Sequence, residues 1–480
     1  MLFNTMTFMV FLVAVLALYA GARSHAQRAG VLLVASFLFY ASWKPAYLLL
    51  LVASLTVNYW FYSALTRHRS KALVVTAVTL NLIVLAISKY IVFLTDNFIF
   101  VWTAVSGQQA AVPEWMHWAL PLGISFYTFH MLSVMIDVYR GQWTERISFR
   151  TWTLYVTFFP HMVAGPILRA SELVAQLEQL APIDRDNLRL GALIFLGGLL
   201  KKVLLADQLA PLADMAFAHP TGLTTTMAWI GSATFSLQMY FDFSGYSEMA
   251  IGLARMFGVN LPRNFLYPYV SRNPREFWQR WHMTFSRWLR DYLYISLGGN
   301  RVGFSRGLVN LMLTMLIGGL WHGAAWTFVF WGFLNGLFLV GHRFLLWIYR
   351  QLGVDRMPRL SSVLSFLGWF SNFALIMVCS RVFFRAESWD DAWTMFYAVL
   401  GMPALTGDPV SYRSFQYAII GGSLAICLLE PRIVGALAKR DLVTLWWSRP
   451  AWLRGCAYAG LVVFLTVFGG AAQKFVYFDF

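Results

Sequence analysis

Long apolar segments recur along almost the whole chain, and this pattern constrains the fold more than any other feature. A helix that crosses a lipid bilayer needs about 20 mostly apolar residues. Segments that reach or approach this length occur at 4–21, 30–43, 46–66, 72–94, 119–139, 190–206, 227–250, 307–323, 325–345, 361–380, 415–431 and 456–473. Only 12% of the residues are charged, which is about half the share found in soluble domains. We therefore predict an all-α polytopic membrane protein with about 11–12 transmembrane helices, in a single domain over residues 1–480.

Two apolar segments need a separate interpretation. Residues 149–168 contain Pro160, Gly165 and Pro166, so we expect a re-entrant or broken helix buried within the protein. Residues 4–21 have no basic segment before them and no obvious small-residue cleavage site after them. We interpret this segment as a retained first span and not as a signal peptide.

The positive charge of the chain points to a membrane and not to nucleic acid. The formal charge is +15, and the Lys and Arg residues lie beside apolar segments, as membrane topology and anionic lipid headgroups require. Their distribution among the short loops places 96–118 and both termini outside and 255–306 inside. Lys201 and Lys202 fit poorly, so either their helix is misplaced or they face a polar interior.

Residues 255–306 are basic and aromatic, with nine arginines and two acidic residues. One interpretation is an interfacial helix with arginines at the headgroups. The other is a cytoplasmic anion site, because arginine donates bidentate hydrogen bonds to phosphate and indoles stack on a base, which suits coenzyme A. In that case Arg280, Trp281 and Arg287, together with Trp321, are the candidate donor-binding residues.

His322 is the candidate reactive residue. It lies between two apolar spans in Trp321-His322-Gly323, where small residues and indoles let a ligand approach. Burial favours the neutral imidazole, which can act as a general base. The alternative is a structural, hydrogen-bonded histidine. His282, in Arg280-Trp281-His282, is predicted to orient a substrate or assist proton transfer, or else to form hydrogen bonds at the interface.

Other polar residues within the apolar segments are interpreted as structural networks, because a polar group in hydrocarbon needs a partner. They are His130, Asp137, His161, Asp242, Ser244 and Glu248. The nine histidines are scattered, and there is no HExxH, paired CxxC, GxSxG or phosphate-loop pattern. No metal site is therefore predicted, and histidine acid–base chemistry is what remains for an enzyme.

Taken together, the motifs resemble those of the membrane-bound O-acyltransferases (MBOAT), in the branch of alginate O-acetylation subunits and teichoic-acid D-alanyl transfer proteins, with the alginate type nearest. The resemblance lies mainly in residues 120–345. It rests on Phe126–Arg140, Phe158–Arg169, Gly198–Lys202, Phe241–Tyr246, Arg275–Arg301 and Trp321–Gly323.

This resemblance implies a helical MBOAT fold with re-entrant or interfacial helices, a cytoplasmic funnel and a central tunnel that leads to an invariant histidine. His322 matches that histidine, and His282 matches the second histidine of the family's pattern. In this branch, the acyl group of a cytoplasmic thioester reaches an acceptor on the outer face through a partner of the SGNH-hydrolase-like type.

The C-terminal tail, residues 474–480, is predicted to lie outside. It resembles the aromatic C-terminal motif of this branch, which implies that Tyr477 carries the acyl group between histidine and partner. The alternative is an interfacial aromatic anchor. Asp479 departs from the motif, where a neutral or basic residue is more usual, and this puts docking in doubt.

The resulting prediction is an O-acetyltransferase of the bacterial inner membrane. It would take acetyl from cytoplasmic acetyl-CoA, a substrate and not a bound cofactor, and pass it to a periplasmic partner for O-acetylation of an exported polysaccharide such as alginate. The alternatives are D-alanyl or other acyl transfer to an envelope polymer, and a transporter that moves a polar solute without chemistry. No repeat between the two halves of the chain supports the transporter.

Overall fold

The computed structural model describes residues 1–163, 165–352, 358–437, 439, 442–468 and 475–476. Helices make up almost all of the regular structure in these ranges, and no strand occurs within them. This confirms the predicted all-α class. Each of the twelve apolar segments identified in the sequence lies largely in helix.

The chain forms two compact units. The first contains Met1–Ala192, Ala250–Pro262 and Gly323–Ala325, and the second contains Leu193–Met249, Arg263–His322 and Trp326–Phe480. Up to Leu200 the helices are α1 (Met6–Gly21), α2 (His25–Ala41), α3 (Tyr47–Arg67), α4 (Lys71–Ser106), η1 (Glu114–Met116), α5 (Ile124–Tyr139), α6 (Phe149–Thr157), α7 (Ala170–Leu177) and α8 (Arg185–Leu200).

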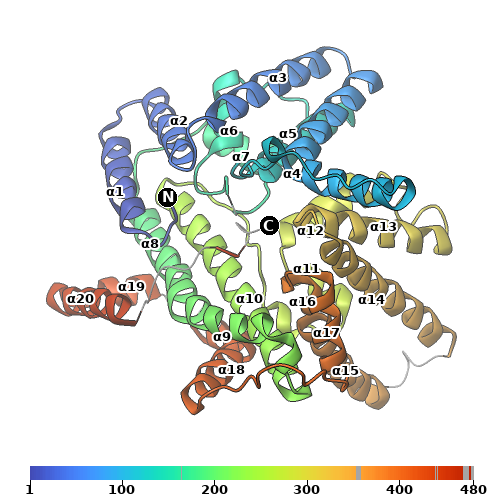
Figure 1. The fold of residues 1–480 in the computed structure, drawn as a ribbon. Coiled ribbons are helices and arrows are strands. Elements are labelled where there is room, and N and C mark those ends of the chain that lie inside the picture. Colours follow the sequence, from blue (N-terminus) through green and yellow to red (C-terminus); the bar gives the residue numbers. More distant parts are fainter. Residues whose placement is uncertain (164, 353–357, 438, 440–441, 469–474, 477–480) are drawn as a thin grey trace. The chain divides into compact units, whose positions relative to one another are not determined.

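The chain then continues through a π-helix into the remaining helices (Figure 1). These are η2 (Lys201–Ala206), α9 (Asp207–Ala218), η3 (Pro220–Gly222), α10 (Thr225–Met256), η4 (Pro268–Val270), α11 (Pro274–Arg280), α12 (Met283–Trp288), η5 (Leu289–Tyr294), α13 (Phe304–His322), α14 (Trp326–Gln351), α15 (Pro358–Asn372), η7 (Phe373–Cys379), α16 (Ser380–Arg385), α17 (Trp389–Val399), α18 (Ser414–Leu437), α19 (Leu442–Trp447) and α20 (Ala451–Phe468).

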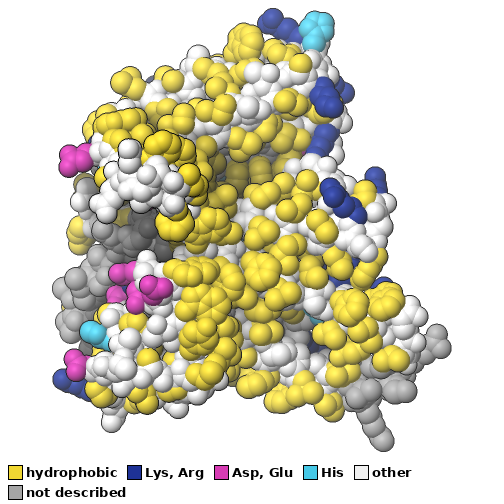
Figure 2. Space-filling model, turned by 45° about the vertical axis from the view of Figure 1, so that its right-hand side comes forward, with side chains coloured by type: hydrophobic (Ala, Val, Ile, Leu, Met, Phe, Trp, Pro, Cys, Tyr) yellow, Lys and Arg dark blue, Asp and Glu magenta, His cyan; other side chains and the backbone are white. Residues whose placement is uncertain are grey.

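Six helical segments in the described residues are long and apolar enough to cross a membrane. They are α3, α4, α13, α14, α18 and the segment Val363–Arg385. Other predicted spans are helical but short, such as the 16 residues of α5, while the 32-residue α10 contains polar residues that lower its hydropathy. Large apolar side chains are exposed along α4, and hydrophobic side chains cover much of the face in Figure 2. An apolar outer surface is what a lipid environment requires.

In the first unit, the chain between α6 and α7 leaves the helical conformation while it remains buried. Helix α6 ends at Thr157, and Phe158–Val163 is buried and not helical. This confirms the predicted broken helix. His161 donates from Nε2 to the Tyr155 carbonyl oxygen at 3.1 Å, and His130 Nε2 accepts from the Leu168 N–H at 3.1 Å. Both fully buried histidines therefore have structural hydrogen bonds.

In the second unit, α13 and α14 run side by side and pack closely at small residues (Figure 1). A Cβ atom added at Gly319 would lie 2.4 Å from the Phe328 carbonyl oxygen, and one added at Gly332 would lie 2.5 Å from that of Met315. Only glycine permits this approach, as in small-residue crossings of membrane helices. The crossing fixes the C-terminal end of α13, where His322 lies.

Candidate functional site

His322 is the last residue of α13 and is buried, with a 3% exposed fraction. Its ring lies among aromatic rings from four helices. The ring centroids of Trp321, Trp331, Phe384 and Phe285 lie 4.8, 4.9, 5.2 and 5.7 Å from that of the imidazole. Such an enclosure excludes water, and this strengthens electrostatic interactions with a reacting group.

His282 lies close to His322, and the two histidines share neighbouring rings. Phe285 and Trp321 stack on each other at 4.3 Å, and each also contacts both histidines. The Phe285 centroid is 5.0 Å from His282 and 5.7 Å from His322. The structure therefore brings together the two histidines predicted from the sequence, which are 40 residues apart.

Asn264 fixes the orientation of the His282 ring. Its side-chain oxygen accepts hydrogen bonds from the Thr284 backbone N–H at 3.3 Å and from the Thr284 hydroxyl at 2.9 Å, and it lies 3.2 Å from His282 Nδ1. Because this oxygen can only accept, Nδ1 carries the proton and the neutral ring has its lone pair on Nε2. That nitrogen is buried and has no hydrogen-bond partner.

The backbone and the burial of His282 are both unusual. The residue has φ 41° and ψ 55°, in the left-handed region, where non-glycine residues are uncommon. Burial lowers its pKa from 6.5 to about 3, so the imidazole is neutral at physiological pH. Such strain, held by surrounding structure, is concentrated at functional sites. His282 thus presents an acceptor nitrogen and does not present a cation.

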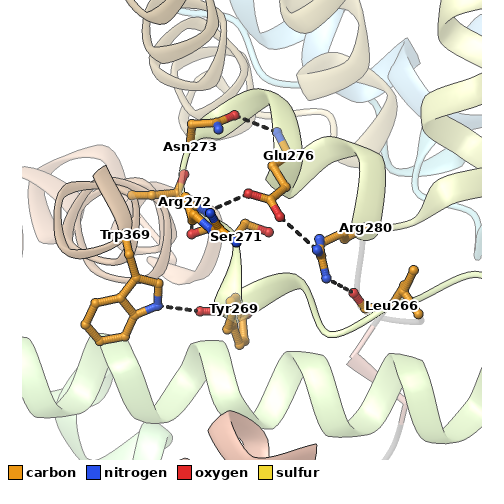
Figure 3. A network of polar contacts seen from close by, with 9 residues as sticks. Leu266, Tyr269, Ser271, Arg272, Asn273, Glu276, Arg280 and Trp369 are labelled. Atoms are coloured by element: carbon orange, nitrogen blue, oxygen red, sulfur yellow. Dashed lines mark hydrogen bonds and ion pairs between the residues drawn. The ribbon is translucent and has the colours of Figure 1, made fainter. Parts of the chain in front are cut away.

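Arg280, a candidate donor-binding residue, is instead bound within its own segment (Figure 3). Its Nη2 lies 2.8 Å from Glu276 Oε1, and its Nη1 donates to the Leu266 carbonyl oxygen at 3.3 Å. Glu276 also accepts from the Arg272 N–H at 2.9 Å, while Asn273 caps α11 through the Glu276 N–H at 2.8 Å. These contacts brace α11, and they use donors that a phosphate would need.

The other candidate donor-binding residues occupy different surroundings. Trp281 and Trp321 are buried in the second unit. Trp321 contacts both histidines, whereas Trp281 stacks on Phe277 at 5.6 Å and lies 4.7 Å below the Arg381 guanidinium. Arg287 is half-buried on α12. Trp321 is therefore the member of this set that lies directly against His322.

Arg381 is a site residue that the sequence reasoning missed. It lies on α16, is 1% exposed, and has its guanidinium carbon 5.7 Å from the Phe384 centroid and 6.0 Å from that of Trp331. Those same two rings contact His322. A charged residue within the apolar run 363–385 was the available signal, because intramembrane arginines are expensive and usually functional.

Lys201 and Lys202, which did not fit the predicted membrane topology, face a polar interior. Lys201 Nζ lies 2.5 Å from Glu248 and 2.6 Å from Glu430, and the Tyr240 hydroxyl donates to Glu430. Lys202 Nζ lies 2.7 Å from Asp207 and 2.8 Å from Asp242. The second of the two alternatives is therefore correct. Asp242 and Glu248 belong to structural ion networks, as the sequence predicted.

Part of the C-terminal tail is docked inside the second unit. The Val476 N–H donates to Asp242 Oδ2 at 2.7 Å, and Phe475 is 1% exposed. The Phe475 ring stacks on Tyr246 at 4.7 Å and contacts Phe243 at 5.6 Å, and Phe243 lies edge-on to His282 at 4.7 Å. Tyr477 itself lies outside the described residues. The chain that leads to it is thus anchored one ring away from His282.

The family model described as MBOAT, membrane-bound O-acyltransferase family, matches residues 140–383. A protein of Pseudomonas aeruginosa named probable alginate O-acetylase AlgI is 42% identical over 374 residues, which are 77% of this chain and 69% of that protein. A peptidoglycan O-acetyltransferase of Helicobacter pylori is 33% identical over 94% of this chain and 91% of that protein.

More distant similarity links the chain to a teichoic acid D-alanyltransferase of Streptococcus thermophilus, which is 30% identical over 46% of this chain and 56% of that protein. The matched region contains the two histidines, the aromatic rings between them and Arg381. These matches agree with the resemblance based on the motifs. This chain belongs to the membrane-bound O-acyltransferase family and is a multi-pass membrane O-acyltransferase.

Proposed function

We propose that this protein transfers acetyl groups from cytoplasmic acetyl-CoA across the bacterial inner membrane, for O-acetylation of an exported polysaccharide such as alginate. The observation that carries the proposal is the buried pair of histidines joined by Phe285 and Trp321. The similarity to an alginate O-acetylase and to a peptidoglycan O-acetyltransferase supports both the acetyl group and a polysaccharide acceptor.

In this proposal His322 is the general base. It removes the proton from an attacking hydroxyl as the oxygen adds to the acetyl carbonyl carbon, and it returns the proton to the thiolate that leaves. General base catalysis of this kind contributes about 10²–10⁴ in rate. The aromatic enclosure keeps water away from the thioester, which limits hydrolysis.

His282 is proposed to assist through Nε2, the acceptor that Asn264 exposes by binding Nδ1. Because its ring is neutral, it can accept a hydrogen bond from another N–H or O–H group of the bound substrate and orient that substrate for attack. Trp321, Trp281 and Arg287 are proposed to bind the donor. Arg280 is proposed to act indirectly by bracing α11, because it is held by Glu276 and Leu266.

Tyr477 is proposed to receive the acetyl group and to pass it to a periplasmic partner of the SGNH-hydrolase-like type. The docking of Phe475 and Val476 supports this role, since it holds the preceding residues near His282. A tyrosine hydroxyl, with an ordinary pKa of about 10, needs a base to attack at neutral pH. The outer location predicted for the tail from the distribution of Lys and Arg fits the same proposal.

The test uses full-length protein in lipid nanodiscs with acetyl-CoA labelled in the acetyl group. Release of label from coenzyme A is measured for the parent, His322→Ala and the matched control His342→Gln, a histidine on α14 away from the aromatic enclosure. We expect a loss of about 10²–10⁴ in His322→Ala only. A folded His322→Ala variant at the parent rate would overturn the assignment, and a parent that leaves acetyl-CoA intact would overturn the donor.

A further inference from the structure

Three buried N–H donors without hydrogen-bond partners belong to Trp331, whose ring contacts His322, and to Arg381, which lies against the Trp331 and Phe384 rings. They are Nε and Nη1 of Arg381 and Nε1 of Trp331. Arg381 is 1% exposed and Trp331 is 2% exposed, so water does not reach the bulk of either side chain. A buried donor without an acceptor is rare in folded proteins and calls for an explanation.

The charge of Arg381 is not balanced by a carboxylate. Among the described residues, no Asp or Glu forms an ion pair with Arg381. By contrast, Arg385, four residues later on the same helix, pairs with Asp214 at 2.8 Å. The surroundings of Arg381 are instead the rings of Trp281, Trp331 and Phe384, and the phenol of Tyr269. Cation–π contacts and a hydrogen bond with the Tyr269 phenol hold the guanidinium in place but leave Nε and Nη1 without an acceptor.

The Arg381 guanidinium and the His322 imidazole have two aromatic neighbours in common. Trp331 and Phe384 lie within 5.2 Å of the His322 ring, and both lie within 6.0 Å of the Arg381 guanidinium carbon. The imidazole and the guanidinium therefore border the same two rings. Acyl transfer needs this combination, with a base for the attacking hydroxyl and donors for the oxygen that becomes negative.

We propose that Arg381 and Trp331 are the oxyanion-binding groups of this site and donate hydrogen bonds to the acyl carbonyl oxygen during transfer. The inference rests on the proposed acyl transfer and adds two catalytic residues to it. The ligand class is a small tetrahedral oxyanion. Donors fixed in a dry site before reaction stabilise such a charge without reorganisation.

Acyl transfer at this site proceeds by addition and elimination at the carbonyl carbon. The attacking hydroxyl oxygen forms a bond to the carbonyl carbon, its proton passes to His322, and the C=O π pair moves onto oxygen, where Arg381 and Trp331 bind it. When the π bond re-forms, the C–S bond breaks and the thiolate takes the proton from His322. Arg381 stays protonated throughout, because arginine is not deprotonated in proteins.

Kinetic tests compare Arg381→Met and Trp331→Phe with matched controls on the same helices. Arg385→Met removes a guanidinium paired with Asp214, and Trp326→Phe changes an exposed indole of α14. We expect Arg381→Met to lower kcat about 10²–10³-fold with KM for the donor little changed. Trp331→Phe should lower kcat less, because it removes a neutral donor. Both controls should keep the parent kcat.

A binding measurement separates this inference from the proposed function. Methylphosphonate has the shape and charge of a tetrahedral acetyl intermediate, and calorimetry reports its affinity without any turnover. We expect binding to the parent and to Arg385→Met, and at least tenfold weaker binding to Arg381→Met, with Arg381→Lys between them because its point charge remains.

Equal affinity of the parent and Arg381→Met for methylphosphonate, or no binding to the parent, overturns the oxyanion site. If the parent binds methylphosphonate through Arg381 but leaves acetyl-CoA intact, the proposed donor fails while the anion site stands. Should Arg381→Met not fold, Arg381→Lys and Trp331→Phe answer the same question. Parent kcat in both of these variants would also overturn the proposal.

Discussion

The backbone N–H of Val476 donates a hydrogen bond to Oδ2 of Asp242 across 2.7 Å, and it joins residues 234 positions apart. The other oxygen of the carboxylate lies 2.8 Å from Lys202 Nζ. A buried ion pair in the middle of α10 thus also serves as the anchor for the C-terminal tail. Asp242 therefore belongs both to the buried ion pair with Lys202 and to the anchor of the tail that leads to Tyr477.

Asp242→Asn should release the tail and destabilise the second unit. The change leaves Lys202 with Asp207 as its remaining carboxylate partner, and breaking a buried pair costs about 3–5 kcal/mol. Mass spectrometry of carboxypeptidase digestion should show faster loss of C-terminal residues than in the parent. Asp214→Asn is the control, because its pair with Arg385 is partly exposed and exposed pairs contribute about 0–1 kcal/mol. Equal digestion rates in parent and Asp242→Asn would contradict the anchor.

Asn264→Ala should lower the rate of acyl transfer indirectly, by changing the orientation of the His282 ring. The substitution removes the acceptor for His282 Nδ1 and for both Thr284 donors. Each buried donor left unsatisfied costs about 1–3 kcal/mol, and the ring is free to change tautomer. We expect lower kcat and a lower Tm. Asn264→Asp keeps an acceptor and should retain more stability than Asn264→Ala, and the reverse order would argue against this role.

Burial of His282 should make stability depend on pH. Its pKa is lowered to about 3 in the folded protein and is about 6.5 in an unfolded chain. Between these values the unfolded chain binds a proton that folded His282 does not, so stability is complete above pH 6.5 and falls as the pH drops toward 3. Between pH 7 and pH 5, His282→Gln should therefore lose less free energy of unfolding than the parent, by on the order of 1 kcal/mol per pH unit below pH 6.5. Its Tm should fall correspondingly less.

The control for that measurement is His68→Gln, at an exposed histidine after α3. Its Tm should change with pH as the Tm of the parent does. An unchanged pH dependence in His282→Gln would show that His282 takes up its proton in the folded state as readily as in the unfolded chain.

Gly319→Ala should separate α13 from α14 and move His322. The added Cβ would lie 2.4 Å from the Phe328 carbonyl oxygen, and overpacking of this kind costs about 1–3 kcal/mol. Gly341→Ala is the matched change on α14, where nothing lies within 4 Å of the added Cβ. It should be neutral or stabilising by up to about 1 kcal/mol. Thermal unfolding and acetyl transfer of the two variants check the contrast, which would be absent if the crossing were loose.

Tyr477 should carry label after incubation with labelled acetyl-CoA. A peptide that contains Tyr477 is expected to hold the acetyl group in the parent, and Tyr477→Phe should abolish both this label and transfer to the partner protein. His322→Ala should also prevent labelling, since the tyrosine hydroxyl needs a base. Label trapped on another residue of the parent would remove Tyr477 from the path.

Local pattern was sufficient for the class of fold and for choosing two candidate site residues, which the structure brings close together. Apolar runs long enough to span a bilayer predicted the helices, since every backbone group in lipid must bond within its own segment. His322 was chosen because a polar residue between two apolar runs needs a partner or a function, and His282 was chosen from its place in the basic, aromatic segment 255–306. Pro160 and Gly165 likewise indicated the break after α6, which ends at Thr157.

The same rules made Arg280 a candidate donor-binding residue and did not take its ion pair with Glu276 into account. An arginine in a basic, aromatic segment suggests an anion site, but Glu276 lies one helical turn earlier and pairs with it at 2.8 Å. Spacing of four residues on a helix brings such side chains together. The composition showed that the segment is basic, but the ion pair with Glu276 uses hydrogen-bond donors of Arg280 that an anion would need.

The sequence by itself determined that this chain is a helical membrane protein and singled out His322 and His282 as candidate site residues, because hydropathy and polar exceptions are local properties. Tertiary structure alone placed Trp331 against His322, Arg381 against Trp331, Asn264 within hydrogen-bond distance of His282, and Phe475 against Tyr246. These neighbours are separated along the chain and come together through helix crossings such as that at Gly319 and Gly332. Such crossings depend on side-chain packing between helices, which no periodicity within one helix records.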